Sequence, residues 1–399
     1  MQKDVVIASA CRTAIGSFLG TLKDIHVKEL GRIVGQEAIK RAGISTSDID
    51  EVVCGNAIQA GAGANVGRQI QGAIGIPWSS PACTVNQLCT SSMRAFEVGA
   101  HNIMSGKTDI CLVVGVENMT MVPHLIQKGR TGYRMGPGTL EDAILLDALI
   151  CSIENYHMGM TAENIASKYV ISRQEQDHLA VISQQRAAAA IREGKFKDEI
   201  VPVEVRQKKK TIVFSTDEHP RPETTEEILA NLKPVFKEGG TVTAGNASGI
   251  NDGAAAAILM SSEKAKNLGL TPLAKVVTTV SAGVDPALMG LGPAVAIPKA
   301  LGQAQLTFDD IDYFEINEAF AAQFLGVVKM LQEEHCFSPD MAKVNRNGSG
   351  ISLGHPLGCS GLRIIVSLLY EMQKLGAKRG CASLCAGGGP AMATIIEMG

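Results

Sequence analysis

The chain has 399 residues, of which 45% are hydrophobic, 4% aromatic and 19% charged, and its formal net charge is −3 at pH 7. This length predicts two or three domains, and the weakly acidic charge with so few aromatic rings argues against a nucleic-acid-binding surface. No apolar run is long enough for a membrane span, and neither end carries a recognisable targeting signal, so we expect a cytoplasmic protein.

In chain order, the first signal is a repeated segment. Residues 38–60 align without a gap with residues 300–322, so that Ile49 falls on Ile311. Each copy predicts a helix, a turn and a strand that ends in a polar loop.

A second pair of segments follows in the same order. Residues 89–95 (CTSSMRA) resemble residues 359–365 (CSGLRII), and each opens an amphipathic helix with a glycine at its expected end, Gly106 or Gly376. Apolar strands are expected directly after these helices, at 109–115 and 380–387. The duplication predicts an α/β fold of two similar halves, with sheets covered on both faces by helices.

The stretch 118–250 has no counterpart in the repeat. Ser172 and Glu175 stand at capping-box spacing before a helical pattern, and residues 203–214 read as a hairpin with lysines 208–210 at its turn. We therefore expect an inserted subdomain that serves as a substrate lid or carrier-binding unit. The expected division is an N-terminal half of 1–117 with about 251–270, an inserted domain of 118–250, and a C-terminal half of 271–399.

Ten cysteines are unusual for a reducing compartment, but disulfide frameworks belong to short secreted chains. There is no C-x-x-C, and His355 with Cys359 lacks a second pair of ligands, so we expect no metal site. Since cysteine is among the most buried residue types, we interpret five as core: Cys11, Cys54, Cys111, Cys151 and Cys381.

Three segments could carry chemistry. Cys89 stands at the predicted start of a helix, whose dipole would lower the pKa of its thiol, although a packed core thiol is the simpler reading. His355 lies in a Gly/Pro-rich loop that allows close approach of a ligand. Cys385 precedes the glycines 387–389, which could form an oxyanion site or only a tight turn.

Two further motifs are weaker. In NEAFAAQ (317–323), Asn317 and Glu318 follow a strand, where open α/β sheets bind ligands. Glu318 could be a base, but we favour a cap for the next helix. The glycines of residues 61–67 (GAGANVG) lack the spacing and acidic partner of a dinucleotide site.

Four blocks in this order resemble the reactive blocks of the thiolase family: VNQLCTSSMRA, NEAFAAQ, LGHPLGCSG and LCAGGGPA. The segments YHMGMTAEN (156–164) and AGNASGINDGAAA (244–256) resemble the same family. The resemblance covers nearly the whole chain and implies a five-layered αβαβα core of two duplicated halves, with 118–250 as a loop domain that holds coenzyme A. It also implies a homotetramer built from dimers, and no metal or other cofactor.

The resemblance assigns roles to five residues. Cys89 would be the nucleophile that becomes acylated, and His355 would activate its thiol. Cys385 would be the acid/base at the α-carbon of the second acyl group. Asn317 would hold a water in one oxyanion hole with His355, and the amides of Cys89 and Gly387 would form the other.

Within the family, YHMGMT and DPALMGLGP (285–293) resemble the short-chain biosynthetic members. The implied activity is that of an acetyl-CoA C-acetyltransferase: a reversible, ping-pong condensation of two acetyl-CoA to acetoacetyl-CoA and CoA through acetyl-Cys89. The alternative is a longer-chain 3-ketoacyl-CoA thiolase of fatty-acid breakdown. Further residues match family positions for substrate: His157, Arg221, Phe236, Ser248 and Phe320 toward coenzyme A, and Met158 and Met289 as walls of the acyl pocket.

The chain departs from the family pattern in small ways. Thr90 and Ser92 follow the nucleophile where the family has glycine. Ser349 and Ala391 are further replacements near the histidine and the second cysteine. These changes affect the expected shape of the pocket rather than the reaction class.

Overall fold

The strands of both halves join in one mixed sheet in the computed structural model, which describes residues 3–207 and 210–399. In the N-terminal half, neighbouring strands run in the order β1 (Val5–Thr13), β13 (Asn251–Ser261), β5 (Ile110–Asn118), β3 (Glu51–Gly55) and β4 (Ala82–Val85). The first three pair antiparallel and the last three parallel. Residues 251–261 thus lie between strands formed by residues 5–13 and 110–118.

The C-terminal half repeats this arrangement with the order β14 (Ala274–Gly283), β17 (Pro390–Met398), β16 (Arg379–Cys385) and β15 (Tyr313–Ile316). The pairings are again two antiparallel and one parallel. The predicted duplication is therefore confirmed. The two sets of strands meet through a short antiparallel pairing of β1 with β14, at Val6 with Lys275 and Ile7 with Ala274.

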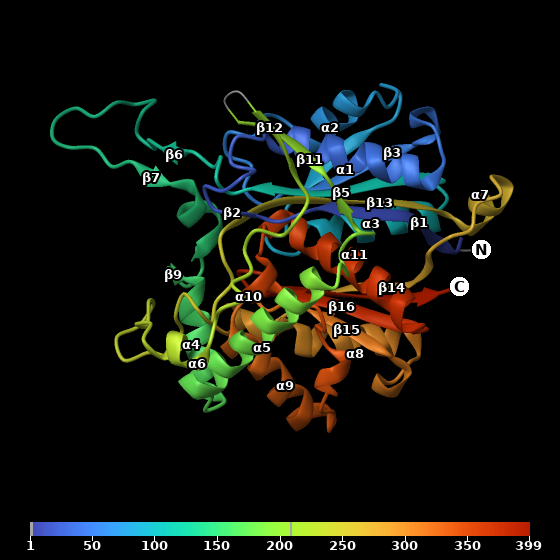
Figure 1. Cartoon of the computed structure of the whole chain (residues 1–399). Helices are drawn as coiled ribbons and strands as arrows, with labels where there is room; N and C mark the ends of the chain where they lie inside the picture. Colours follow the sequence, from blue (N-terminus) through green and yellow to red (C-terminus); the bar gives the residue numbers. More distant parts are fainter. Residues whose placement is uncertain (1–2, 208–209) are drawn as a thin grey trace.

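Helices cover both sets of strands and separate them (Figure 1). On the outer face of the first set lie α1 (Val27–Ala42) and α2 (Val66–Ile74), and on that of the second lie α8 (Gly292–Ala304) and α9 (Ala321–His335). Between the sets, α3 (Ser91–Met104) packs against α11 (Leu357–Leu375). The layers are αβαβα, as the resemblance implied.

Local sequence explains how the strands and helices pack. The strand β13 (NDGAAAAILMS) is buried along its whole length, and its small alanines let α1 and α11 pack closely on its two faces. Helix α11 ends at Gly376, whose φ of 63° is the left-handed conformation that glycine adopts without strain. Gly106, also left-handed, follows the end of α3, so both predicted helix ends are confirmed. The five cysteines interpreted as core are buried.

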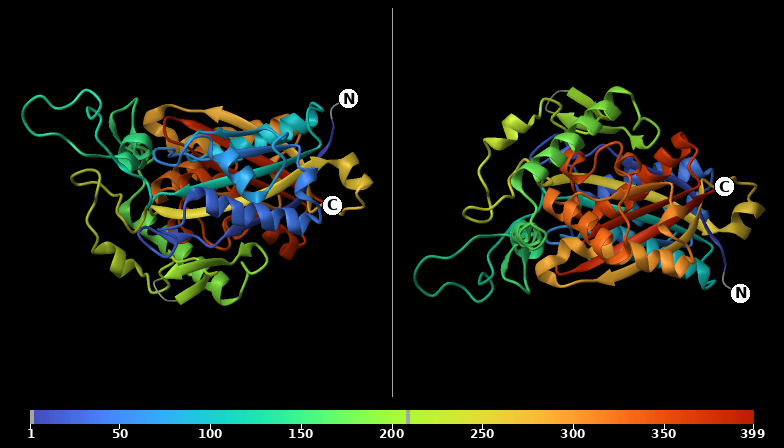
Figure 2. Two further views of the ribbon diagram at one scale, coloured as in Figure 1. Left: turned by 90° about the horizontal axis from the view of Figure 1, so that it is seen from above. Right: turned by 90° about the horizontal axis from the view of Figure 1, so that it is seen from below.

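The insertion contributes its own helices and a hairpin. Helix α5 (Arg173–Arg192) starts with the predicted capping box of Ser172 and Glu175. The predicted hairpin is present as β11 (Val203–Gln207) and β12 (Lys210–Phe214), whereas Lys208 and Lys209 lie outside the described residues. The segment 124–142 extends away from the body in every view (Figures 1 and 2).

The remaining elements are short apart from α4. They are β2 (Gly16–Ser17), β6 (His124–Leu125), β7 (Glu141–Asp142), a π-helical turn (Leu145–Leu149), β8 (Ile150–Cys151), β9 (Tyr156–His157), α4 (Met158–Lys168), β10 (Ile200–Val201), α6 (Glu226–Ala230), α7 (Ser262–Asn267) and α10 (Gly350–Leu353), with 3₁₀ turns at Thr46–Asp48, Pro286–Leu291, Phe308–Asp310 and Met341–Lys343. Within the described ranges, no helix combines the length and the apolar character needed to cross a membrane.

Candidate active site

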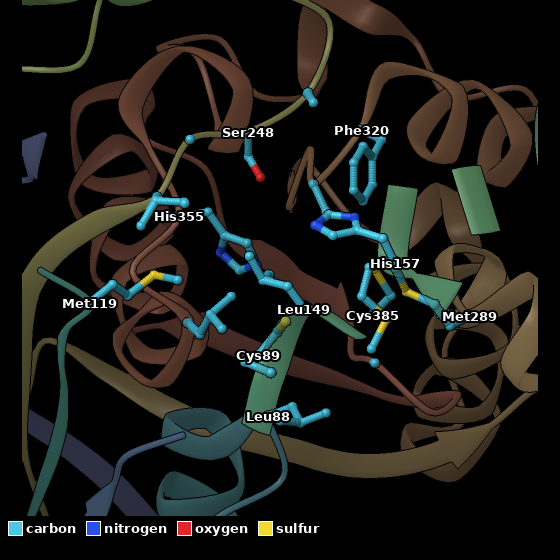
Figure 3. A pocket seen from close by; sticks show the side chains of 18 of the residues that line it. Leu88, Cys89, Met119, Leu149, His157, Ser248, Met289, Phe320, His355 and Cys385 are labelled. Carbon is cyan, nitrogen blue, oxygen red and sulfur yellow. The ribbon is translucent and has the colours of Figure 1, made fainter. Parts of the chain in front are cut away.

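A cavity of about 300 Å³ opens where the two halves and the insertion meet. Its lining is mostly apolar, with two cysteines and two histidines among the side chains that face it (Figure 3). All but two of the predicted site residues line it: Cys89, His157, Met158, Phe236, Ser248, Met289, Phe320, His355, Cys385 and Gly387. Segments that are far apart in the sequence therefore meet as predicted.

Cys89 sits on a tight turn between β4 and α3. Its neighbour Leu88 has a φ of 49°, a left-handed conformation that is unusual for a residue with a side chain. Helix α3 begins at Ser91 with Thr90 as its N-cap, so Cys89 lies just before the helix and not in its first turn. The amide groups of Cys89 itself and of Gly387 donate to the sulfur.

The expected lowering of the Cys89 pKa is wrong. Burial raises the pKa of this thiol to about 11, and the two amide donors only partly offset the loss of water. At neutral pH the group is a thiol, which needs a base to become a nucleophile.

His355 is 4% exposed and lies in the loop before α11. Its Nδ1 is 2.6 Å from the hydroxyl of Ser360, and that hydroxyl donates its only hydrogen to the carbonyl of Pro356, 2.8 Å away. Ser360 must therefore accept a hydrogen bond from His355, which puts the ring proton on Nδ1. The Nε2 atom is left with a free lone pair and has no hydrogen-bond partner among the described residues.

The charge state of His355 agrees with this tautomer. Burial lowers the pKa of His355 to about 3, with a further contribution from the positive charge of Arg363. The ring is neutral at pH 7 and can take a proton through Nε2. Figure 3 shows the Cys89 sulfur and the His355 ring directed into the same space.

Cys385 ends β16 and is 2% exposed. Burial, and then the nearby Cys89, raise its pKa above the ordinary range of a thiol. After it, Gly388 and Gly389 adopt φ of 79° and 100° in a tight turn, while the amide of Gly387 faces the Cys89 sulfur. The tight turn is therefore confirmed at Gly388 and Gly389, and the oxyanion site at Gly387 stays a prediction.

Two predicted residues do not line the cavity. Asn317 is fully buried, accepts a hydrogen bond of 3.4 Å from Arg363, and has no partner for its Nδ2 in the described part of the chain. Arg221 is exposed, and its amide donates to Gln184. The motif matched both residues, but their side chains stand outside the cavity wall.

The expectation that Glu318 caps a helix is wrong. Helix α9 starts at Ala321 with Phe320 as N-cap and without a side-chain cap. The Glu318 carboxylate instead accepts hydrogen bonds of 2.6 Å from Ser183 and 2.9 Å from Asn345. It joins the insertion to the C-terminal half.

Three aromatic rings form one wall of the cavity. His157 stacks on Phe236 with ring centroids 4.6 Å apart, and Phe236 meets Phe320 edge-on at 6.3 Å. The His157 Nδ1 accepts from the amide of Gly159, where any Cβ would come within 2.3 Å of the Phe236 ring. Glycine at this position is therefore required for the stacked wall.

Sequence reasoning missed several apolar residues of the lining, including Leu88, Met119, Leu149 and Leu357. Met119 directly follows β5, and a position at a strand end could have signalled it. The others have no sequence signal beyond being apolar. In the described ranges, no group of three or more His, Cys, Asp or Glu could hold a metal ion.

Comparison with known proteins agrees with this geometry. The family model for the thiolase N-terminal domain matches residues 5–263, and that for the thiolase C-terminal domain matches residues 270–398. The chain belongs to the thiolase family. As a thiolase, it is an acyltransferase enzyme.

Three relatives illustrate the likeness. The acetyl-CoA acetyltransferase of Syntrophomonas wolfei is 53% identical over 399 residues, which is all of both chains. A solved structure of the acetyl-CoA acetyltransferase from Syntrophomonas wolfei has a TM-score of 0.99, at 52% identity over all of both chains. The human mitochondrial 3-ketoacyl-CoA thiolase in complex with CoA has a TM-score of 0.94 at 41% identity, covering 100% of this chain and 98% of that one.

Proposed function

We propose that this thiolase is an acetyl-CoA C-acetyltransferase that condenses two acetyl-CoA to acetoacetyl-CoA and CoA, reversibly and by a ping-pong route. The observation that carries the proposal is a neutral His355 with a free Nε2 on the same cavity as two buried thiols. The relatives named acetyl-CoA acetyltransferase support acetyl groups as the substrate.

In the first half-reaction, His355 Nε2 takes the Cys89 proton, and the thiolate attacks the thioester carbonyl. The amides of Cys89 and Gly387 stabilise the oxyanion that forms. Cys385 donates its proton to the departing thiolate of CoA, which leaves acetyl-Cys89.

In the second half-reaction, the Cys385 thiolate removes the α-proton of a second acetyl-CoA, and the enolate attacks acetyl-Cys89. His355 returns its proton as the Cys89 sulfur leaves. Every proton is accounted for, because the one lost from the α-carbon restores Cys385. In this proposal Asn317, whose side chain lies outside the cavity wall, acts at the enolate oxygen through a water held by its unpartnered Nδ2.

The coenzyme A portion would follow His157, Phe236 and Ser248, all of which belong to the inserted domain 118–250. This supports the division of the chain into two halves and a coenzyme-A-binding loop domain. The homotetramer remains a proposal from the family resemblance, and the cytoplasmic location remains a proposal as well.

Substrate length is tested by thiolysis. The proposal expects the highest kcat/KM for acetoacetyl-CoA, with a steady fall as the 3-ketoacyl chain lengthens, because Met158 and Met289, which line the cavity, would wall its acyl end. Equal or higher kcat/KM for long chains would contradict the acetyl assignment without affecting the family.

A further inference from the structure

A buried carboxylate outside the cavity lining connects the two catalytic loops. Glu117, in β5, is fully buried. Its Oε1 accepts from the Asn56 side chain at 2.9 Å and from the Ile58 amide at 3.2 Å. Its Oε2 accepts from the amides of Ala57 at 2.9 Å and Gly358 at 2.8 Å. Each oxygen thus holds two N–H donors.

These donors belong to two different halves of the molecule. Residues 56–58 follow β3 in the N-terminal half, whereas Gly358 is in the first turn of α11, three residues after His355. The approach is close, since a Cβ on Gly358 would lie 2.6 Å from Glu117 Oε2 and 2.7 Å from the Ala57 nitrogen. Only glycine allows this contact.

The link continues to the nucleophile. The carbonyl of Ala57 accepts from the Asn86 side chain at 2.9 Å, and the Asn86 oxygen accepts from the amide of Leu88 at 2.9 Å. Leu88 is the left-handed residue that turns the chain into Cys89. A short series of hydrogen bonds therefore runs from Glu117 to each catalytic loop.

We propose that Glu117, as a carboxylate, is a positioning residue that sets the Cys89 loop against the His355 loop. The inference rests on the proposed function, because it assigns a purpose to the relative placement of nucleophile and base. A small misplacement of reacting groups by a remote change can cost about 100-fold in rate, so such a residue affects catalysis without touching substrate.

The charge on Glu117 matters because its two oxygens accept four N–H hydrogen bonds, which leave neither oxygen free to carry a proton. Protonation must break at least one of the four contacts. Burial raises the pKa of Glu117 to about 7, and the four donors counteract this only in part. Neither the Cys89 thiol nor the His355 ring has its pKa near that value, so we expect the acetylation rate to show an acid limb near pH 7 that follows protonation of Glu117.

Other titratable groups face Glu117 from the neighbouring elements. They are Cys54 on β3, Cys89 before α3 and Cys359 on α11. On the adjacent strand β13, Asp252 pairs with Asn118, so its side chain points to the other face of the sheet, where it accepts hydrogen bonds from Thr120. Burial raises the thiol pKa of Cys54 above its usual range and that of Cys359 to about 12. Two buried carboxyl groups are rivals for the acid limb: Asp252, whose pKa burial raises to about 6, and Glu315, whose pKa burial raises to about 8.

The test compares Glu117→Gln, Glu117→Asp and a matched control in the full chain. Glu51→Gln removes a carboxylate from the opposite end of β3, where it accepts one hydrogen bond from Asn102. The rate of Cys89 acetylation by acetyl-CoA is followed by mass spectrometry between pH 5 and 9, with KM for acetyl-CoA.

Glu117→Gln is expected to lower the acetylation rate about 100-fold at pH 8, with KM within twofold, because its amide nitrogen must face two N–H donors. It is also expected to lose the acid limb near pH 7. Glu117→Asp should keep the acid limb of the acetylation rate and lose less of that rate than Glu117→Gln. Glu51→Gln should acetylate as the wild type does.

The inference is overturned if Glu117→Gln acetylates at the wild-type rate, or if its acid limb is unchanged and so belongs to another group, such as Asp252 or Glu315. A wild-type protein that forms no acetyl adduct contradicts the proposed function instead. If Glu117→Gln does not fold, Asn86→Ala breaks the series without removing a charge. Asn86→Ala is expected to lower the acetylation rate about tenfold and to keep its acid limb. An unchanged acetylation rate would overturn the inference.

Discussion

The hydroxyl of Ser92 accepts a hydrogen bond of 2.8 Å from the amide of Leu362 and donates one of 3.0 Å to the carbonyl of Cys359. It thereby joins the starts of α3 and α11, the two helices that the repeat relates. Thr90 similarly donates to the carbonyl of Gln87, 2.8 Å away. Thr90 and Ser92, the two side chains that replace family glycines, therefore form hydrogen bonds with backbone groups and fix the starts of these helices.

Ser92→Ala should lower the free energy of unfolding by about 1 kcal/mol, the usual net value of one buried hydrogen bond. Acetylation of Cys89 should change less than threefold. Urea denaturation measures the first quantity, with Ser105→Ala, an exposed hydroxyl at the other end of α3, as the control. An unchanged unfolding free energy would show that the Ser92 hydroxyl contributes nothing.

Ser360→Ala should slow acetylation of Cys89 by about 10- to 100-fold, because a buried N–H left without an acceptor costs roughly 1–3 kcal/mol. The His355 proton would no longer be fixed on Nδ1, which a change in the ¹⁵N chemical shifts of the ring would report. Ser367→Ala, a buried serine further along α11 whose hydroxyl reaches Glu199, is the matched control. Equal effects of both substitutions would exclude a specific role in the tautomer.

Cys385→Ala should separate the two half-reactions. The variant should still accept an acetyl group on Cys89, although more slowly, because Cys385 no longer protonates the departing CoA. Exchange of the acetyl-CoA α-protons with deuterated water should fall by at least about 100-fold, since a positioned base contributes roughly 10²–10⁴-fold. Cys381→Ala, a buried thiol earlier on the same strand, serves as control. Wild-type exchange in Cys385→Ala would assign the base elsewhere.

Met158→Ala and Met289→Ala should widen the acyl end of the cavity. For 3-ketoacyl-CoAs two carbons longer than acetoacetyl-CoA, kcat/KM should rise about tenfold relative to acetoacetyl-CoA, since each buried methylene is worth about 0.8 kcal/mol. Steady-state thiolysis with a series of chain lengths measures this ratio. A parallel loss for all chain lengths would mean that the methionines only support the wall.

Much of the architecture could be predicted from local signals. Ile49 with Ile311, and Met93 with Leu362, align the two halves, and strand order repeats accordingly. The short pairing of Val6 with Lys275 that joins the two sets of strands could not be foreseen. It depends on how the halves pack, which no local pattern encodes.

Motifs predicted many of the residues that line the cavity, but not the pKa values of its titratable groups. A position at a helix start predicts a lowered pKa for Cys89. Burial in the apolar cavity has the larger effect and raises that pKa. Arg221 and Asn317 match motifs yet stand outside the cavity wall. No sequence pattern pointed to Glu117 or Ser360. Glu117 acts through contacts between segments that are distant in the sequence, and Ser360 through the direction in which its hydroxyl hydrogen points.

The most direct test of Cys89 as the acetylated nucleophile is the intact mass of the protein after brief incubation with acetyl-CoA. An acetyl-Cys89 intermediate predicts one acetyl adduct on the wild-type chain with release of one CoA, and no adduct on Cys89→Ala. A wild-type chain that stays unmodified and releases no CoA, or an adduct that persists in Cys89→Ala, would contradict it.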